Sequence, residues 1–121
     1  MNRTYYTTKP AECEKQKYAV IIRLEITEIE PKSEEEQTQY TALEFYVFSP
    51  YDENRIFKKV MDDKFGNDYE NKLINEFNGA QMGLYPDAEM EQKIQRYKAF
   101  LQQRNELKAT VERICLENGI L

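Results

Sequence analysis

The chain has 121 residues, a formal net charge of −5, 40% hydrophobic residues and 32% charged residues. This length suits a single domain, and the composition is that of a folded chain. Because the sequence contains no histidine, Ser-His and Cys-His catalysis and histidine-bearing metal sites are excluded. No apolar run reaches the length of a membrane span and no secretory leader is recognisable, so we expect a cytoplasmic protein.

Alternating apolar residues predict an antiparallel hairpin in the first half of the chain. Its first strand is expected from Tyr18 to Glu30 and its second from Gln39 to Ser49. The segment from Arg3 to Thr8 is a candidate third strand, limited by Pro10. We therefore expect a small antiparallel sheet.

The two faces of this hairpin differ in character. One face is expected to enter the core; it carries Tyr18, Val20, Ile22, Leu24, Ile26, Leu43, Phe45 and Val47. The opposite face is unusually aromatic and carries Ile21, Tyr40, Tyr46 and Phe48. Aromatic side chains supply large contact areas at low entropic cost, so this second face is a candidate interface. The alternative is that a helix covers it as a second core layer.

The negative charge is concentrated between the two strands. Residues 25–36 contain six acids and one base, and the rest of the chain is neutral overall. A protein without a basic footprint is not expected to bind nucleic acid. Three consecutive acids, Glu34, Glu35 and Glu36, form either a solvated hairpin tip or an acidic contact for a basic partner.

A change to helical periodicity follows the hairpin. Ser49 and Pro50 are typical of a helix start, with Asp52 able to complete a capping box, and Gly66 is expected to end this helix. A second helix is capped by Asn67 or Asp68. Its expected buried face consists of Tyr69, Leu73, Phe77, Ala80 and Leu84.

The last third of the chain, from Pro86 to about Asn118, is predicted to form one amphipathic helix roughly 50 Å long, because no proline or glycine interrupts it. Its first apolar stripe, Met90, Ile94, Tyr97 and Leu101, is expected to pack on the second helix. A second stripe is displaced by roughly a quarter turn and consists of Phe100, Leu107, Val111 and Ile114. We expect this second stripe to pack either on the sheet or on another chain. Arg104 and Lys108 interrupt the heptad and disfavour one continuous coiled coil.

These elements predict an α+β fold in which a small antiparallel sheet is followed by three helices, the last of them long. We expect a single domain over residues 1–121, with the sheet in 1–49 and the helices in 50–121.

The sequence contains few candidates for catalysis or cofactor binding. It has no P-loop and no GxGxxG motif, and Cys13 and Cys115 lack the spacing of a redox or zinc site. No cofactor or metal is therefore expected. A pair of carboxylates on neighbouring strands, Glu25 and Glu44, is the one catalytic arrangement left open.

Several segments carry a resemblance to a known group of proteins. They are Leu73-Ile74-Asn75-Glu76-Phe77-Asn78, Gly83-Leu84-Tyr85 and Tyr97-Lys98-Ala99-Phe100-Leu101, with Arg104 and Leu107. This pattern, in about the C-terminal third, resembles small uncharacterised proteins encoded by bacteriophages and prophages. The resemblance implies a virion component or a protein acting in the host cytosol, and it brings no catalytic or ligand residues.

We therefore expect a non-enzymatic protein that makes protein-protein contacts, as a homo-oligomer or within a larger assembly, through its aromatic sheet face and its long helix. The alternative is a small acidic inhibitor that engages a basic partner through Glu34, Glu35 and Glu36. An enzyme based on carboxylates is the third reading.

Overall fold

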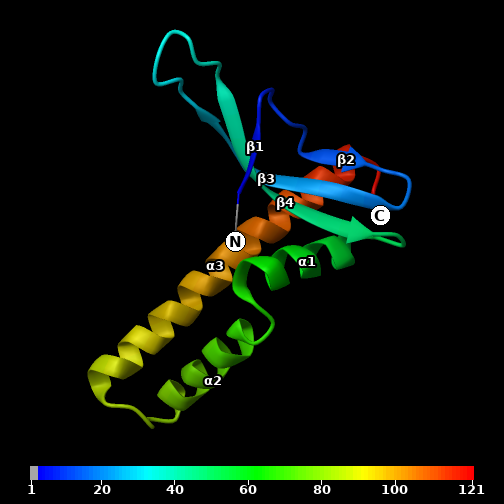
Figure 1. Ribbon diagram of the computed structural model, residues 1–121. Coiled ribbons are helices and arrows are strands. Elements are labelled where there is room, and N and C mark those ends of the chain that lie inside the picture. The colour runs from blue at the N-terminus through cyan, green and yellow to red at the C-terminus, as the bar shows by residue number, and fades with distance from the viewer. Residues whose placement is uncertain (1–2) are drawn as a thin grey trace.

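In the computed structural model, which describes residues 3–121, an antiparallel sheet is followed by three helices (Figure 1). The elements are β1 Thr4–Tyr6, β2 Cys13–Lys15, β3 Ala19–Ile29, β4 Gln39–Phe48, α1 Glu53–Phe65, α2 Tyr69–Gln81 and α3 Asp87–Glu117. The strand order is β1-β4-β3-β2. The predicted α+β fold is confirmed, and β2 is an additional short strand that the sequence did not reveal.

Two helix boundaries differ from the predicted ones. The start of α1 lies at Glu53, because the cap is Asp52, whose carboxylate accepts a 2.8 Å hydrogen bond from the Arg55 amide, and not Ser49. The second helix ends at Gln81, so Leu84 lies beyond it and is 69% exposed. The prediction that Leu84 belongs to a buried helix face is therefore wrong.

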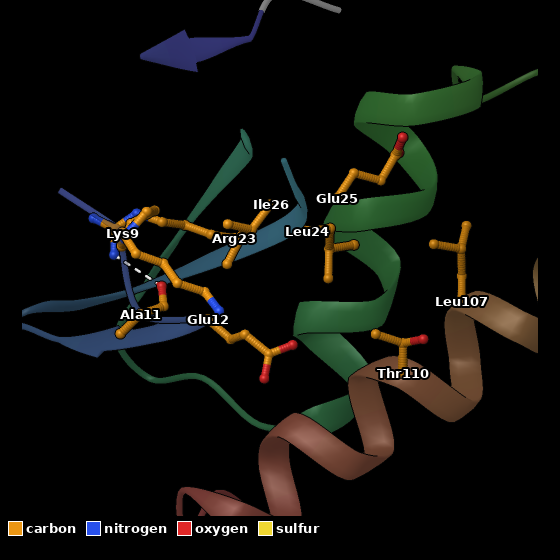
Figure 2. Close-up of a pocket in the computed structure, with 10 residues that line it drawn as sticks. Lys9, Ala11, Glu12, Arg23, Leu24, Glu25, Ile26, Leu107 and Thr110 are labelled. Carbon is orange, nitrogen blue, oxygen red and sulfur yellow. Dashed lines mark hydrogen bonds between the residues drawn. The ribbon is translucent and has the colours of Figure 1, made fainter. Parts of the chain in front are cut away.

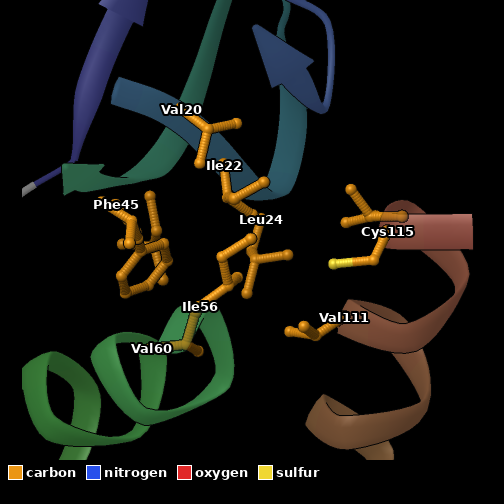
Figure 3. Packing of buried hydrophobic residues seen from close by; sticks show 11 residues of the cluster. Val20, Ile22, Leu24, Phe45, Ile56, Val60, Val111 and Cys115 are labelled. Atoms are coloured by element: carbon orange, nitrogen blue, oxygen red, sulfur yellow. The ribbon is translucent and has the colours of Figure 1, made fainter. Parts of the chain in front are cut away.

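The core lies between one face of the sheet and two helices. The side chains of β3 and β4 on this face meet Ile56 and Val60 of α1 and Val111 and Cys115 of α3 (Figure 3). The sheet contributes Val20, Ile22, Leu24, Leu43, Phe45 and Val47. One apolar cluster thus joins the sheet to the helical part of the chain.

The second apolar stripe of α3 belongs to the interior of this chain. Val111 and Ile114 are fully buried in the core, and Leu107 packs against it. Phe100 is 3% exposed and lies edge-on to the rings of Phe65 and Tyr69, at centroid distances of 5.2 and 5.6 Å. Leu107, Val111 and Ile114 therefore pack on the core beneath the sheet, as one of the two alternatives expected. Phe100 instead packs between α1 and α2, so none of the four is a free interface.

The helices α2 and α3 form an antiparallel arm that projects from the sheet (Figure 1). The rings of Phe77 and Tyr97 meet across it at a tilt of 46°, with centroids 4.8 Å apart. Glu76 of α2 forms ion pairs with Lys93 and Arg96 of α3, at 3.8 and 3.4 Å. The prediction that the first half of α3 packs on α2 is confirmed.

A bulge in β3 changes which residues face the core. Leu24 lies opposite Leu43, but Thr27 lies opposite Thr41, so Glu25 and Ile26 share one partner position. Glu25 has φ 52°, the one positive φ of a non-glycine residue in the described chain. Even-numbered residues of β3 therefore face the core only as far as Leu24, and not through Ile26 as expected. From Thr27 onward, the odd-numbered residues lie on the core side of the sheet.

Candidate functional site

The helices cover one face of the sheet (Figure 1). The strand register places the sequence-predicted aromatic residues on the opposite, outer face. Tyr46 and Phe48 are 45% and 67% exposed at the end of β4. Ile21 lies between its cross-strand neighbours Glu14 and Tyr46 and is only 2% exposed. It is therefore the floor of this surface, and its expected role as a contact residue is wrong.

The aromatic face is divided into two parts. Tyr46 and Phe48 lie at one end, whereas Tyr40 is half-buried and pairs with Tyr6 of β1 at the other. Glu44 lies between them on β4, opposite Arg23 of β3. The aromatic residues therefore lie on the same side of the sheet, as predicted. They do not form one continuous patch.

A polar network around Arg23 occupies the middle of the outer face. Its Nε donates to the Glu44 carboxylate and to the Tyr6 hydroxyl, both at 3.1 Å. Its two terminal nitrogens reach the Ala11 carbonyl at 3.2 Å and the Glu14 carboxylate at 3.4 Å. The Tyr6 hydroxyl in turn donates to Glu44. These bonds satisfy a guanidinium that is more than nine-tenths buried.

The ionisation of this network follows from burial and charge. Burial, and then the hydrogen bond to Glu44, raise the pKa of Tyr6. Burial alone would lower the pKa of Arg23, but its hydrogen bonds to Glu44 and Tyr6 outweigh burial and raise it. Arg23 therefore stays protonated, and Tyr6 is a neutral phenol at physiological pH.

The three sequence-predicted acidic contacts lie away from this network. Glu34, Glu35 and Glu36 are exposed in the loop between β3 and β4, which projects beyond the sheet (Figure 1). The Glu36 carboxylate accepts a 2.9 Å hydrogen bond from the Lys32 amide, which ties one end of the loop. The loop thus presents its other two carboxylates to solvent.

A cleft of about 570 Å³ lies beside the bulge (Figure 2). Leu24 and Ile26 line it from β3, and Leu107 and Thr110 line it from α3. Its rim carries Lys9, Glu12 and Glu25. The volume is in the range of small-molecule sites, but the rim carboxylates are already held by cations of the chain.

Both rim carboxylates make ion pairs. Glu12 binds Arg113 at 2.6 Å, and this hydrogen bond lowers the pKa of Glu12. The Glu25 carboxylate lies 2.9 Å from Lys64 and 3.7 Å from Arg3. These contacts fasten the loop before β2 to α3, and the bulge to α1.

The carboxylate pair left open by the sequence does not form. Glu25 is held on the helical side by Lys64 of α1, whereas Glu44 is held on the outer face by Arg23. The two groups therefore point to opposite sides of the sheet and share no reacting centre. Within residues 3–121, no cluster of three or more Cys, Asp or Glu side chains is placed to bind a metal ion.

The two cysteines are free thiols at the core. Cys115 is buried, and burial raises its pKa to about 11. Cys13 packs against the same cluster, and burial also raises its pKa. Because the thiolate is the reactive form, neither thiol is primed for chemistry.

Sequence reasoning missed the Arg23 network and the ion pairs of Glu25. Arg23 and Glu44 each lie between apolar residues in a strand, which is a usable signal. Pairing Arg23 with Glu44 requires the hairpin register, which the sequence did not determine. The bulge at Glu25 and Ile26 could not be seen in the alternation of apolar and polar residues.

No protein-family model, curated protein or solved structure matches this chain. Over residues 3–121, none of the helices combines the length and apolar character that a membrane crossing requires.

Proposed function

We propose that the chain is a non-enzymatic interaction protein that self-associates through the outer face of its sheet. The observation that carries this proposal is the exposure of Phe48 and Tyr46 beside the buried Ile21, on the face opposite the core. Exposed aromatic side chains on a rigid sheet are typical anchors of protein interfaces.

The charge of this face is compatible with contact between two copies. Arg23 is flanked by Glu14 and Glu44, and its side chain is itself buried, so this network adds little unbalanced charge to the middle of the outer face. The concentrated negative charge lies elsewhere, in the exposed loop with Glu34 and Glu35. Two copies can therefore approach through this face without bringing their acidic loops into the contact.

Self-association is tested by sedimentation velocity over micromolar to high-micromolar concentrations. We expect a reversible assembly larger than a monomer, and Phe48→Ser should weaken it about tenfold, as expected for an interface anchor. Leu84→Ser is the matched control, because Leu84 is 69% exposed and Phe48 67%. A monomer at every concentration, or equal weakening by both variants, would contradict the proposal.

The projecting loop favours a second candidate function. Glu34 and Glu35 are exposed and lie at the end of a hairpin that extends beyond the sheet. A small acidic inhibitor would use such a loop to bind a basic protein. Binding of that kind weakens with added salt and is lost when the three glutamates are replaced by glutamine.

A further inference from the structure

The outer edge of β4 is open over half its length. β1 pairs only with residues Tyr40 to Ala42 of β4. Among residues 3–121, no strand pairs with this edge from Leu43 to Phe48. Unpaired backbone groups on a strand edge can accept a further strand.

The direction of the edge groups follows from two hydrogen bonds at the end of β4. The Ser49 amide donates to the Tyr18 carbonyl at 2.8 Å, on the β3 side. The Phe48 carbonyl accepts from Arg55 Nη1 at 3.3 Å, on the opposite side. Because successive residues of a strand point their backbone groups to alternate sides, Glu44, Tyr46 and Phe48 direct their amides to the open edge.

A groove of about 340 Å³ lies between this edge and α1. Tyr46, Val47 and Phe48 form its strand side. Its helix side carries three cations and one carboxylate, Arg55, Lys58, Lys59 and Asp62. The groove is therefore locally positive in a chain whose net charge is −5.

The cations of the groove can be shared with a ligand. Lys58 contacts Asp62 at 2.8 Å and Lys59 contacts Asp63 at 3.2 Å, both one helical turn away. Such pairs between exposed side chains contribute little and are readily exchanged. No acidic side chain within residues 3–121 forms an ion pair with Arg55, whose contact is the Phe48 carbonyl.

We propose that the open edge of β4 binds an extended, acidic segment of another protein by strand addition. Backbone hydrogen bonds would form with Glu44, Tyr46 and Phe48. Since side chains alternate along a strand, one set would place carboxylates against Arg55 and Lys58, and the other set would place apolar groups beside Phe48. This site lies at the sheet edge and goes beyond the self-association proposed for the outer face.

Charge argues against a second copy at this edge. Antiparallel pairing of two β4 edges about a twofold axis would leave both α1 helices on the same side of the joined sheet. Arg55, Lys58 and Lys59 of the two copies would then meet at one junction. Like charges placed together disfavour that contact, whereas an acidic segment complements it.

The test uses a capped peptide of alternating glutamate and valine, with the corresponding lysine and valine peptide as its counterpart. Fluorescence anisotropy should show saturable binding of the acidic peptide only. Amide exchange measured by NMR should slow at Glu44, Tyr46 and Phe48 when the acidic peptide is added. The amides of Phe45 and Val47 already face β3, so their exchange should not change in the same way.

Two charge-reversal variants separate the groove from overall charge. Lys58→Glu with Lys59→Glu should weaken binding of the acidic peptide at least about tenfold. Lys98→Glu with Lys108→Glu changes the net charge equally at exposed positions of α3 and should leave binding within about twofold. NMR spectra of both variants establish that the fold is kept.

Several outcomes would overturn the strand-addition proposal. They are equal binding of the two peptides, equal effects of the two double variants, and acidic-peptide binding without protection of the three edge amides. Protection of those amides without peptide, together with a doubled mass, would assign the edge to a second copy. Self-association is measured by sedimentation without peptide, and strand addition by peptide binding and amide exchange, so either proposal can fail alone.

Discussion

Ile114→Ala is expected to lower the free energy of unfolding by about 2–5 kcal/mol. Ile114 is fully buried on α3 among the sheet residues of the core, so truncation leaves a cavity. The matched control on the same helix is Leu116→Ala, because Leu116 is 83% exposed. Its change should stay within about 0.5 kcal/mol. Urea denaturation followed by circular dichroism measures both values.

The comparison of Ile114 with Leu116 tests whether the C-terminal half of α3 completes the core within one chain. Equal, small effects of the two substitutions would mean that this half of the helix is not packed on the sheet. The expectation that its apolar stripe faces another chain would then be restored.

Arg23→Met is expected to destabilise the chain by about 3–5 kcal/mol, because it leaves the Glu44 carboxylate without its cation in a largely buried position. The Glu44 side chain is 14% exposed and lies 3.1 Å from Arg23. Adding Glu44→Gln to Arg23→Met removes the unpaired charge, so much of the lost stability should return. A double-mutant cycle of thermal or urea unfolding measures this coupling.

Additive effects of the Arg23 and Glu44 substitutions would contradict the network. Tyr6→Phe extends the test, because it removes only the hydroxyl that donates to Glu44 and accepts from Arg23. A loss of about 1.5–3 kcal/mol is expected, because both partners of the hydroxyl are charged and hydrogen bonds to charged groups contribute more than neutral ones.

The sequence predicted the fold where periodicity and burial agree. Val20 and Ile22 alternate with residues of the outer face, and the register with Phe45 and Val47 places them in one core. The long helix was equally clear, since no proline or glycine interrupts it between Asp87 and Glu117.

The parts that could not be predicted depend on contacts distant in sequence. The three residues of β2 become a strand only through pairing with β3, and such a short segment has no periodicity of its own. The bulge at Glu25 is held by Lys64 and Arg3, which are remote along the chain. The sequence showed that the second apolar stripe of α3 is displaced by a quarter turn from the first. Only the tertiary structure shows that Val111, in this stripe, faces the sheet and not another chain.

The same limit applies to the candidate site. The aromatic residues Tyr46 and Phe48 were found because strand alternation places them on one face. Their separation from Tyr40 was missed, because Arg23 and Glu44 meet between them only in the correct register. The cations beside the β4 edge were missed because α1 and β4 come together in three dimensions, as the groove with Lys58 and Lys59 shows.

The outer face around Phe48 is the surface that we propose as the contact between copies of the chain. Its most direct test replaces Phe48 with the photoreactive residue p-benzoylphenylalanine and identifies the cross-linked peptides by mass spectrometry, mixing isotope-labelled and unlabelled protein. We expect cross-links between labelled and unlabelled chains that map to outer-face residues such as Tyr46. Cross-links confined to one chain, or none above those of the same probe at Leu84, would contradict it.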